Sequence, residues 1–186
     1  LSVFLLVLAF CFFHFLSLES ERWFIASEKE DIRAIKAVTE SKVEFCLKIL
    51  HCPLAAGKEY ARMTFTSWLP PEERISAGEK AIACLRQAYN RDYMEEISVL
   101  NNMGEVSLMH DDFAAAKTFY HQAVDLILQE QARSAQAFLK DNERDSWSDR
   151  EKTEALYGLA KSLQALGEID LAQKYFEKTV LSSASD

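Results

Sequence analysis

The histidine and aspartates near the middle of the chain are the first side chains whose types could do chemistry. His110, Asp111 and Asp112 are consecutive, and imidazole and carboxylate groups are common ligands of transition metals. They lie between two stretches with the apolar spacing of helices, however, where a polar turn is expected in any case. No glycine-rich phosphate loop, H-E-x-x-H pair or nucleophile elbow occurs in the sequence. The sequence therefore predicts a protein that is not an enzyme and that holds neither a metal nor another cofactor.

The four cysteines, Cys11, Cys46, Cys52 and Cys84, do not have the paired C-x2-C spacing of a zinc site. Cys46 and Cys52 are six positions apart, so one continuous helix would place them on different faces. A disulfide between them would need a break in the helix near Pro53. We expect four small buried side chains instead.

Composition and charge favour a helical chain and argue against nucleic acid as a partner. There are 5 glycines and 3 prolines in 186 residues, and 49% of the residues are hydrophobic. So few chain-breaking residues favour long helices over a β fold with many turns. The net charge of −8 and the lack of a basic stripe argue against a surface that binds phosphates.

The sequence begins with an apolar stretch, Leu1–Leu18, in which fifteen of the eighteen residues are apolar. As a helix it would be about 27 Å long, enough to cross the hydrocarbon core of a membrane. We therefore predict an apolar helix over residues 1–18, a transmembrane or signal-anchor segment, and a membrane-associated protein with a single N-terminal span. Trp23 suits the membrane interface. A cleaved signal peptide and a buried helix of a soluble core are the alternatives.

Residues 19–53 are predicted to form an N-terminal helical segment. Ser27–Leu50 has the apolar spacing of a helix, and Ser27 is placed to cap its N-terminus. A further helix is expected over Leu54–Trp68. Pro70–Pro71 then marks a boundary, since proline suits the first turn of a helix but not its interior. The later helices are predicted over residues 71–90, 92–109, 113–139, 149–166 and 168–181.

Two stretches of the chain show the same pattern of large and small side chains at an offset of 56 residues. Each has two large residues three positions apart, directly followed by a small one, and later a small residue with an aromatic residue four positions after it. A glycine inside a helix costs about 1 kcal/mol relative to alanine, so Gly104 needs a reason in packing. The aligned residues are Leu100, Met103, Gly104, Ser107, Ala116, Tyr120 and Ala123 in one stretch and Leu156, Leu159, Ala160, Leu163, Ala172, Phe176 and Thr179 in the other.

This pattern resembles the tetratricopeptide repeat, W-x2-L-G-x2-Y…A-x3-F, and the letters LNNMG at residues 100–104 resemble its kinesin-light-chain type. The resemblance implies an all-α fold, an antiparallel helix-pair solenoid over residues 54–186 that the apolar N-terminal helix precedes. The clear units are residues 98–128 and 154–182. A weaker unit is indicated by the alanines and leucine at positions 81, 85 and 88.

The family pattern also implies roles for the packing residues. Small side chains occupy the places where the two helices of a unit approach closely, and an aromatic side chain fills the space between one unit and the next. Asp111 and Gly167 fall on the turns, where a left-handed backbone is expected. The implied packing residues are Gly104, Ala116, Tyr120 and Ala123 in the first unit and Ala160, Ala172 and Phe176 in the second.

The first helices of such a solenoid line a groove. Asn101 and Tyr157 are its strongest candidates, because an amide can hydrogen-bond an extended peptide and a tyrosine adds contact area. The alternative is that both contact the chain's own neighbouring helix. Because Glu105 and Glu154 oppose a single lysine, a basic or neutral partner segment is expected. The groove-facing residues that the resemblance implies are Ser98, Asn101, Glu105, Leu108, Glu154, Tyr157, Lys161 and Gln164.

The expected function is that of a non-enzymatic scaffold that binds a protein or peptide partner and is anchored in a membrane through Leu1–Leu18. One alternative is a structural subunit of a larger complex, a membrane complex included, in which no groove is free. The other is a secreted or soluble helical domain whose apolar start is a targeting peptide.

Overall fold

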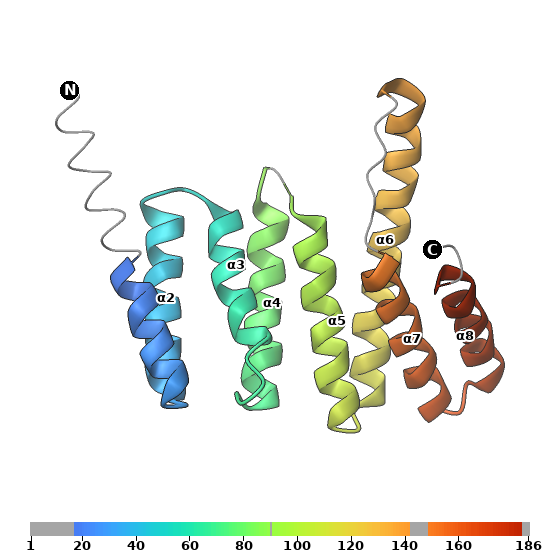
Figure 1. The fold of residues 1–186 in the computed structure, drawn as a ribbon, viewed down its shortest axis with the longest axis horizontal. Helices are drawn as coiled ribbons and strands as arrows, with labels where there is room; N and C mark the ends of the chain where they lie inside the picture. The colour runs from blue at the N-terminus through green and yellow to red at the C-terminus, as the bar shows by residue number, and fades with distance from the viewer. Residues whose placement is uncertain (1–16, 90, 142–148, 184–186) are drawn as a thin grey trace.

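A computed structural model describes residues 17–89, 91–141 and 149–183 of the chain (Figure 1). Within these residues every regular element is a helix and no strand occurs, so the predicted all-α class is confirmed. The first described helix covers residues 17–28. The helices that follow are α2 (Ile32–Lys48), α3 (Pro53–Thr64), α4 (Pro71–Gln87), α5 (Tyr93–Met109), α6 (Phe113–Asp141), α7 (Asp149–Ala165) and α8 (Ile169–Ser183).

The helices stand side by side in one row that follows their order in the chain (Figure 1). The most extensive contacts join α3 to α4, α5 to α6 and α7 to α8, so consecutive helices pack as pairs. Contacts also join α3 to α5 and α5 to α7. The first helix of each of these pairs therefore touches the first helix of the next. The C-terminal part of α6 extends beyond its neighbours (Figure 1).

Local sequence signals fix the start of several helices. Pro71 is the first residue of α4, and Glu72 lies in the first turn, where a carboxylate complements the positive end of the helix. The side chain of Asp92 caps α5 by accepting a hydrogen bond from the backbone N–H of Glu95 at 3.1 Å. The predicted start of α4 at residue 71 is confirmed, and α5 begins one residue after its predicted start at residue 92.

Two turns have the left-handed backbone that was predicted for them. Asp111 has φ 61° between α5 and α6, and Gly167 has φ 79° between α7 and α8. An aspartate tolerates this conformation better than most side chains, and glycine adopts it without a steric penalty. The two helix pairs therefore turn at the positions that the repeated pattern aligned.

Two predicted boundaries in the N-terminal half are wrong. Ser27 lies inside the helix over residues 17–28, and Asp31 caps α2 by accepting a hydrogen bond from the N–H of Ala34 at 3.0 Å. The left-handed backbone of Glu30, with φ 50°, separates two helices where one had been predicted. The helix predicted to reach Trp68 is α3, which ends at Thr64.

The structure does not support the predicted single N-terminal membrane span. Residues 1–16 of the apolar stretch lie outside the described residues, and the last two belong to the helix over residues 17–28. In the part of the chain that the structure describes, no helix is both long enough and apolar enough to cross a membrane. Trp23, expected at a membrane interface, is half-buried and packs against a cluster that contains Ala26, Ile35 and Met63.

The main hydrophobic core lies between the helices of the α3–α8 part of the row. It is built from side chains that are almost fully buried, among them Leu100 and Met103 of α5 and Leu159 of α7. Tyr120 of α6 belongs to the same cluster and is 3% exposed. This core holds α5 and α7 next to each other, and their shared surface is the candidate site.

Candidate functional site

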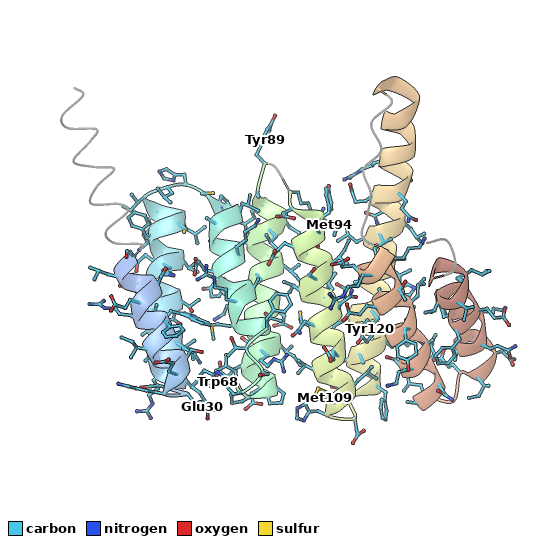
Figure 2. All side chains as sticks on the ribbon, in the orientation of Figure 1. Glu30, Trp68, Tyr89, Met94, Met109 and Tyr120 are labelled. Carbon is cyan, nitrogen blue, oxygen red and sulfur yellow. The ribbon has the colours of Figure 1, made fainter. Side chains whose placement is uncertain are left out.

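The ring of Tyr120, which is labelled in Figure 2, packs against two glycines that lie on different helices. A Cβ atom on Gly104 of α5 would lie 2.7 Å from Cε2 of the ring, and one on Gly158 of α7 would lie 2.2 Å from Cζ. Neither position therefore has room for a side chain. Gly104 had been expected to permit a close approach of two helix backbones, but its neighbour is the Tyr120 ring. Gly158 was not singled out in the sequence.

The other packing residues implied by the repeat pattern are mostly buried. Phe176 is the exception, because it is half-buried and meets the ring of Tyr157 edge-on, with the ring centroids 5.9 Å apart. This contact lies within the α7–α8 pair, whereas Tyr120 bridges from its own pair to the next. The buried small residues are Ala116, Ala123, Ala160 and Ala172, each 0–2% exposed.

Most residues of the predicted groove lie at the surface of α5 and α7. Tyr157 is 49% exposed, and the Nζ atom of Lys161 lies 5.6 Å from the centre of its ring, a cation–π distance. Ser98 and Leu108 are half-buried. The remaining exposed residues of the set are Glu105, Glu154 and Gln164.

Asn101 is the member of the predicted groove that is buried. It is 3% exposed, and its Nδ2 atom donates a hydrogen bond to the backbone carbonyl of Glu151 at 3.0 Å. The side chain therefore contacts the chain's own neighbouring helix, which was the alternative for this residue. This bond ties α5 to the first turn of α7. Among the described residues, the amide oxygen of Asn101 has no hydrogen-bond donor.

Acidic side chains gather where α5 meets α7. Burial raises the pKa of Glu154, and the nearby carboxylates Glu105 and Glu151 raise it further, while Arg150 opposes the shift. The Oε2 atom of Glu151 is buried and has no hydrogen-bond partner in the part of the chain that is described. We call Asn101, Glu105, Glu151 and Glu154 the α5–α7 seam.

Arg74 of α4 borders this seam. Its guanidinium donates hydrogen bonds to the Thr64 carbonyl at 2.8 Å and to Oδ1 of Asn102 at 2.9 Å. Burial lowers the pKa of Arg74, and the charge of Glu105 opposes this shift. Arg74 was not among the predicted site residues, since its contacts join residues that lie 10 and 28 positions apart.

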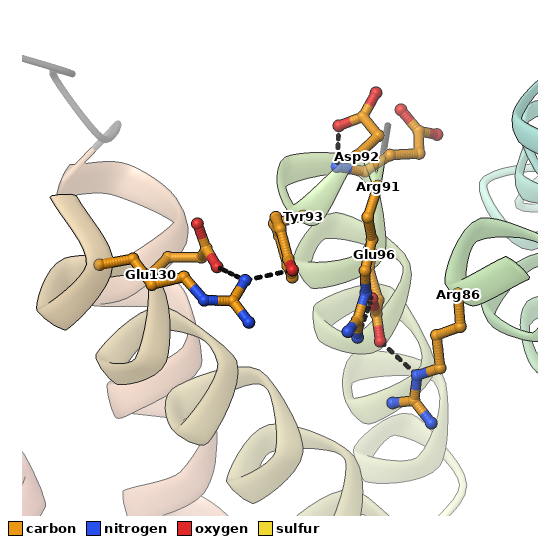
Figure 3. Close-up of polar contacts among 8 residues, drawn as sticks. Arg86, Arg91, Asp92, Tyr93, Glu96 and Glu130 are labelled. Carbon is orange, nitrogen blue, oxygen red and sulfur yellow. Dashed lines mark hydrogen bonds and ion pairs between the residues drawn. The ribbon is translucent and has the colours of Figure 1, made fainter. Parts of the chain in front are cut away.

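The sequence also did not indicate a second polar cluster, which lies at the N-terminal end of α5 (Figure 3). Glu96 is fully buried and accepts hydrogen bonds from Nε of Arg86 at 2.6 Å and from Nη2 of Arg91 at 2.7 Å. Arg91 and Arg133 each lie against the ring of Tyr93. Arg133 also donates a hydrogen bond to the hydroxyl of Tyr93, which attaches α6 to the first turn of α5.

The residues first considered for chemistry do not form a site in the described part of the chain. His110 and Asp112 are exposed in the α5–α6 turn, and Asp112 accepts a hydrogen bond from the N–H of Ala115 at 3.0 Å, as a helix cap does. No three His, Cys, Asp or Glu residues in the described ranges are placed to hold a metal ion. Cys46, Cys52 and Cys84 are free thiols, the first buried and the others half-buried, and Cys11 lies outside the described residues.

Comparison with known proteins provides no family for this chain. No model of a known protein family matches it, and a search of curated proteins finds no match either.

Proposed function

We propose that the chain is a non-enzymatic helical-repeat scaffold that binds a protein or peptide partner along α5 and α7. The observation that carries this proposal is the contrast between the two faces of these helices. One face is packed through glycine and alanine positions against α6 and α8. The other presents Glu105, Glu154 and Tyr157 at the surface, on first helices that touch each other.

The proposal includes the repeat arrangement itself. The α5–α6 and α7–α8 pairs turn at a left-handed residue, and each carries a buried alanine early in its second helix, Ala116 and Ala172. Their first helices are in contact, as are those of α3–α4 and α5–α6. Stacked helix pairs of this kind resemble tetratricopeptide repeats and leave an extended surface lined by their first helices.

A structural subunit of a larger assembly is the second candidate function. It is favoured by large apolar side chains exposed near both ends of the row. Phe24 of the first described helix is 60% exposed, and Ile169 of α8 is 58% exposed. Such side chains are often buried against another protein. In this case the apolar ends, and not the α5–α7 face, would carry the interaction.

A selection for binding peptides separates the two functions. Peptides displayed on phage are selected on the full chain, and their affinity is then measured by fluorescence anisotropy. We expect Tyr157→Ala to weaken binding about tenfold, because an exposed tyrosine at an interface supplies contact area and a polar tip. Tyr89→Ala is the matched control, since Tyr89 is fully exposed on the α4–α5 turn, away from this face (Figure 2).

Equal effects of the two substitutions, or a failure to select any peptide, would contradict the proposed scaffold function. Tyr157 also touches Phe176, so the melting temperature of each variant is measured first. Variants that melt as the parent chain does can be compared directly. Phe24→Ser and Ile169→Ser test the second function, which predicts that these substitutions reduce self-association or aggregation.

A further inference from the structure

The carboxylates of the α5–α7 seam form no ion pair within the part of the chain that the structure describes. No ion pair joins Glu105, Glu151 or Glu154 to a lysine, arginine or histidine among the described residues. The charges of Glu105 and Glu151 both reach Glu154. Like charges placed together in this way repel one another, and the repulsion is relieved by a bound cation.

The Glu96 cluster shows what a buried carboxylate takes as a partner in this fold. Its two oxygens accept hydrogen bonds from two arginines that come from α4 and from the α4–α5 turn. Guanidinium groups suit this role because they offer several donors in a fixed plane. The α5–α7 seam offers comparable acceptors without the arginines.

Buried acceptor atoms in the same seam provide an independent observation. Asn101 is only 3% exposed, and among the described residues its amide oxygen has no hydrogen-bond donor. The nitrogen of the same amide is held by the Glu151 carbonyl, so the amide lies between α5 and α7. Oε2 of Glu151 lacks a donor as well. A buried acceptor without a donor costs about 1–3 kcal/mol, so the seam is short of donors.

The cations nearest to the seam do not neutralise it. Arg74 is held by the Thr64 carbonyl and by Asn102. Arg150 is exposed, and its charge reaches Glu154 without an ion pair. Lys161 lies over the ring of Tyr157. Within the described ranges, none of these three side chains forms an ion pair with a carboxylate of the seam.

We propose that the α5–α7 seam binds an arginine or lysine side chain of a partner peptide, with Glu105 and Glu154 contacting the cation. Glu151 and Asn101 lie behind these two carboxylates with buried acceptor atoms that lack a donor among the described residues, and Tyr157 lies beside the peptide on α7. This assignment rests on the proposed scaffold function and names the chemistry of its partner. Arginine is the better ligand of the two, because its planar group can reach several acceptors at once.

The test uses three labelled peptides that differ at one kind of residue. The first alternates arginine with serine, the second replaces arginine by citrulline, which has nearly the same shape without the charge, and the third replaces it by glutamate. Each is titrated with the full chain and with two double variants. Glu105→Gln with Glu154→Gln alters the seam. Glu79→Gln with Glu177→Gln makes the same change in net charge at exposed positions on α4 and α8.

We expect the arginine peptide to bind about tenfold more tightly than the citrulline peptide, and the seam variant to lose about the same factor. The control variant should change the affinity by less than about twofold. Equal losses in the seam and control variants would overturn the proposal, because attraction would then come from the net charge of −8 as a whole.

The same titrations, repeated with the Tyr157→Ala variant, separate this proposal from the scaffold function. If the citrulline or glutamate peptide binds as tightly as the arginine peptide and Tyr157→Ala still weakens binding, the scaffold function stands and the cation site is wrong. If none of the three peptides binds, the cation site is wrong, and the phage selection alone decides the scaffold function.

Discussion

The ring of Tyr120 packs directly on Gly158, although the two residues belong to different helix pairs. A Cβ atom at position 158 would lie 2.2 to 2.5 Å from three atoms of the ring. The same ring also packs on Gly104, where a Cβ atom would lie 2.7 to 2.9 Å from three of its atoms. A side chain at either position would therefore require the ring to shift. This contact joins α6 to the pair that follows it.

Gly158→Ala should therefore lower the free energy of unfolding by about 1–3 kcal/mol, although alanine is favoured over glycine inside a helix. Denaturant unfolding of the variant and the parent chain measures the change. Tyr120→Leu removes the ring, so the double variant should be less destabilised than the sum of the two single ones. Additive effects would show that the two residues are not in contact.

Leucine in place of Ala116 or Ala172 should overpack the contact between the two helices of a pair. Both alanines are almost fully buried, and the extra methylene groups should cost about 1–3 kcal/mol. The measurement is the free energy of unfolding in denaturant. Ala114→Leu serves as control on the exposed face of α6 and should change it by less than about 0.5 kcal/mol. Unchanged stability in both buried variants would argue against the helix-pair repeat.

Glu96→Gln tests the buried carboxylate that two arginines share. The substitution keeps the shape of the side chain but leaves Arg86 and Arg91 without a negative partner. Both arginines are partly exposed, which softens the loss, and we expect a decrease of about 1–3 kcal/mol in unfolding free energy. Glu79→Gln, at an exposed position of the preceding helix, should have little effect. Equal stabilities of the two variants would contradict a structural role for Glu96.

The seam should make stability depend on pH through Glu154. Burial, with the charges of Glu105 and Glu151, raises the pKa of this carboxyl above its ordinary 4.5 in the folded chain, while Arg150 opposes the shift. The folded state therefore holds the proton more tightly than the unfolded state does. The resulting stabilisation is complete below about pH 4.5 and is lost as the pH rises through the raised pKa.

Glu154→Gln removes this titration. The variant should gain stability relative to the parent chain between about pH 4 and about pH 7, and unfolding curves of both proteins at the two values measure the gain. The phenol of Tyr120 also faces Glu105 and Glu154, but it stays neutral in this range because burial raises its pKa. A stability difference that is the same at both pH values would show that Glu154 is not perturbed in the folded chain.

The sequence was most informative where structure depends on neighbouring residues. Pro71 begins its helix as predicted, because proline suits the first turn of a helix. The helix predicted from residue 92 begins at Tyr93, and Asp92 caps it. The same local signal gave a wrong prediction at Ser27. It could have capped a helix, but the left-handed backbone at Glu30 moves that role to Asp31. The spacing of apolar residues does not show whether Ser27 or Asp31 caps the helix.

The site was less predictable because its contacts are distant in sequence. The pattern of small residues identified Gly104 and Ala160, but not Gly158, which accommodates a ring from the preceding pair. The sequence indicated that Asn101 is accessible to a ligand. Its side chain instead donates a hydrogen bond to the Glu151 carbonyl, 50 positions away, inside the protein. The surface positions of Glu105 and Tyr157, in contrast, agree with the face that the repeat pattern had implied.

The order of contacts along the row has a consequence for how the chain folds. Among α2 to α8, each helix touches its immediate neighbours in sequence and at most the next but one. Only short loops must therefore close before stabilising contacts form, and such topologies fold fast compared with sheets that join distant segments. Folding can begin at one pair and spread to its neighbours. The central pair, α5 with α6, is packed from both sides, so its amide hydrogens should exchange with solvent more slowly than those of α8.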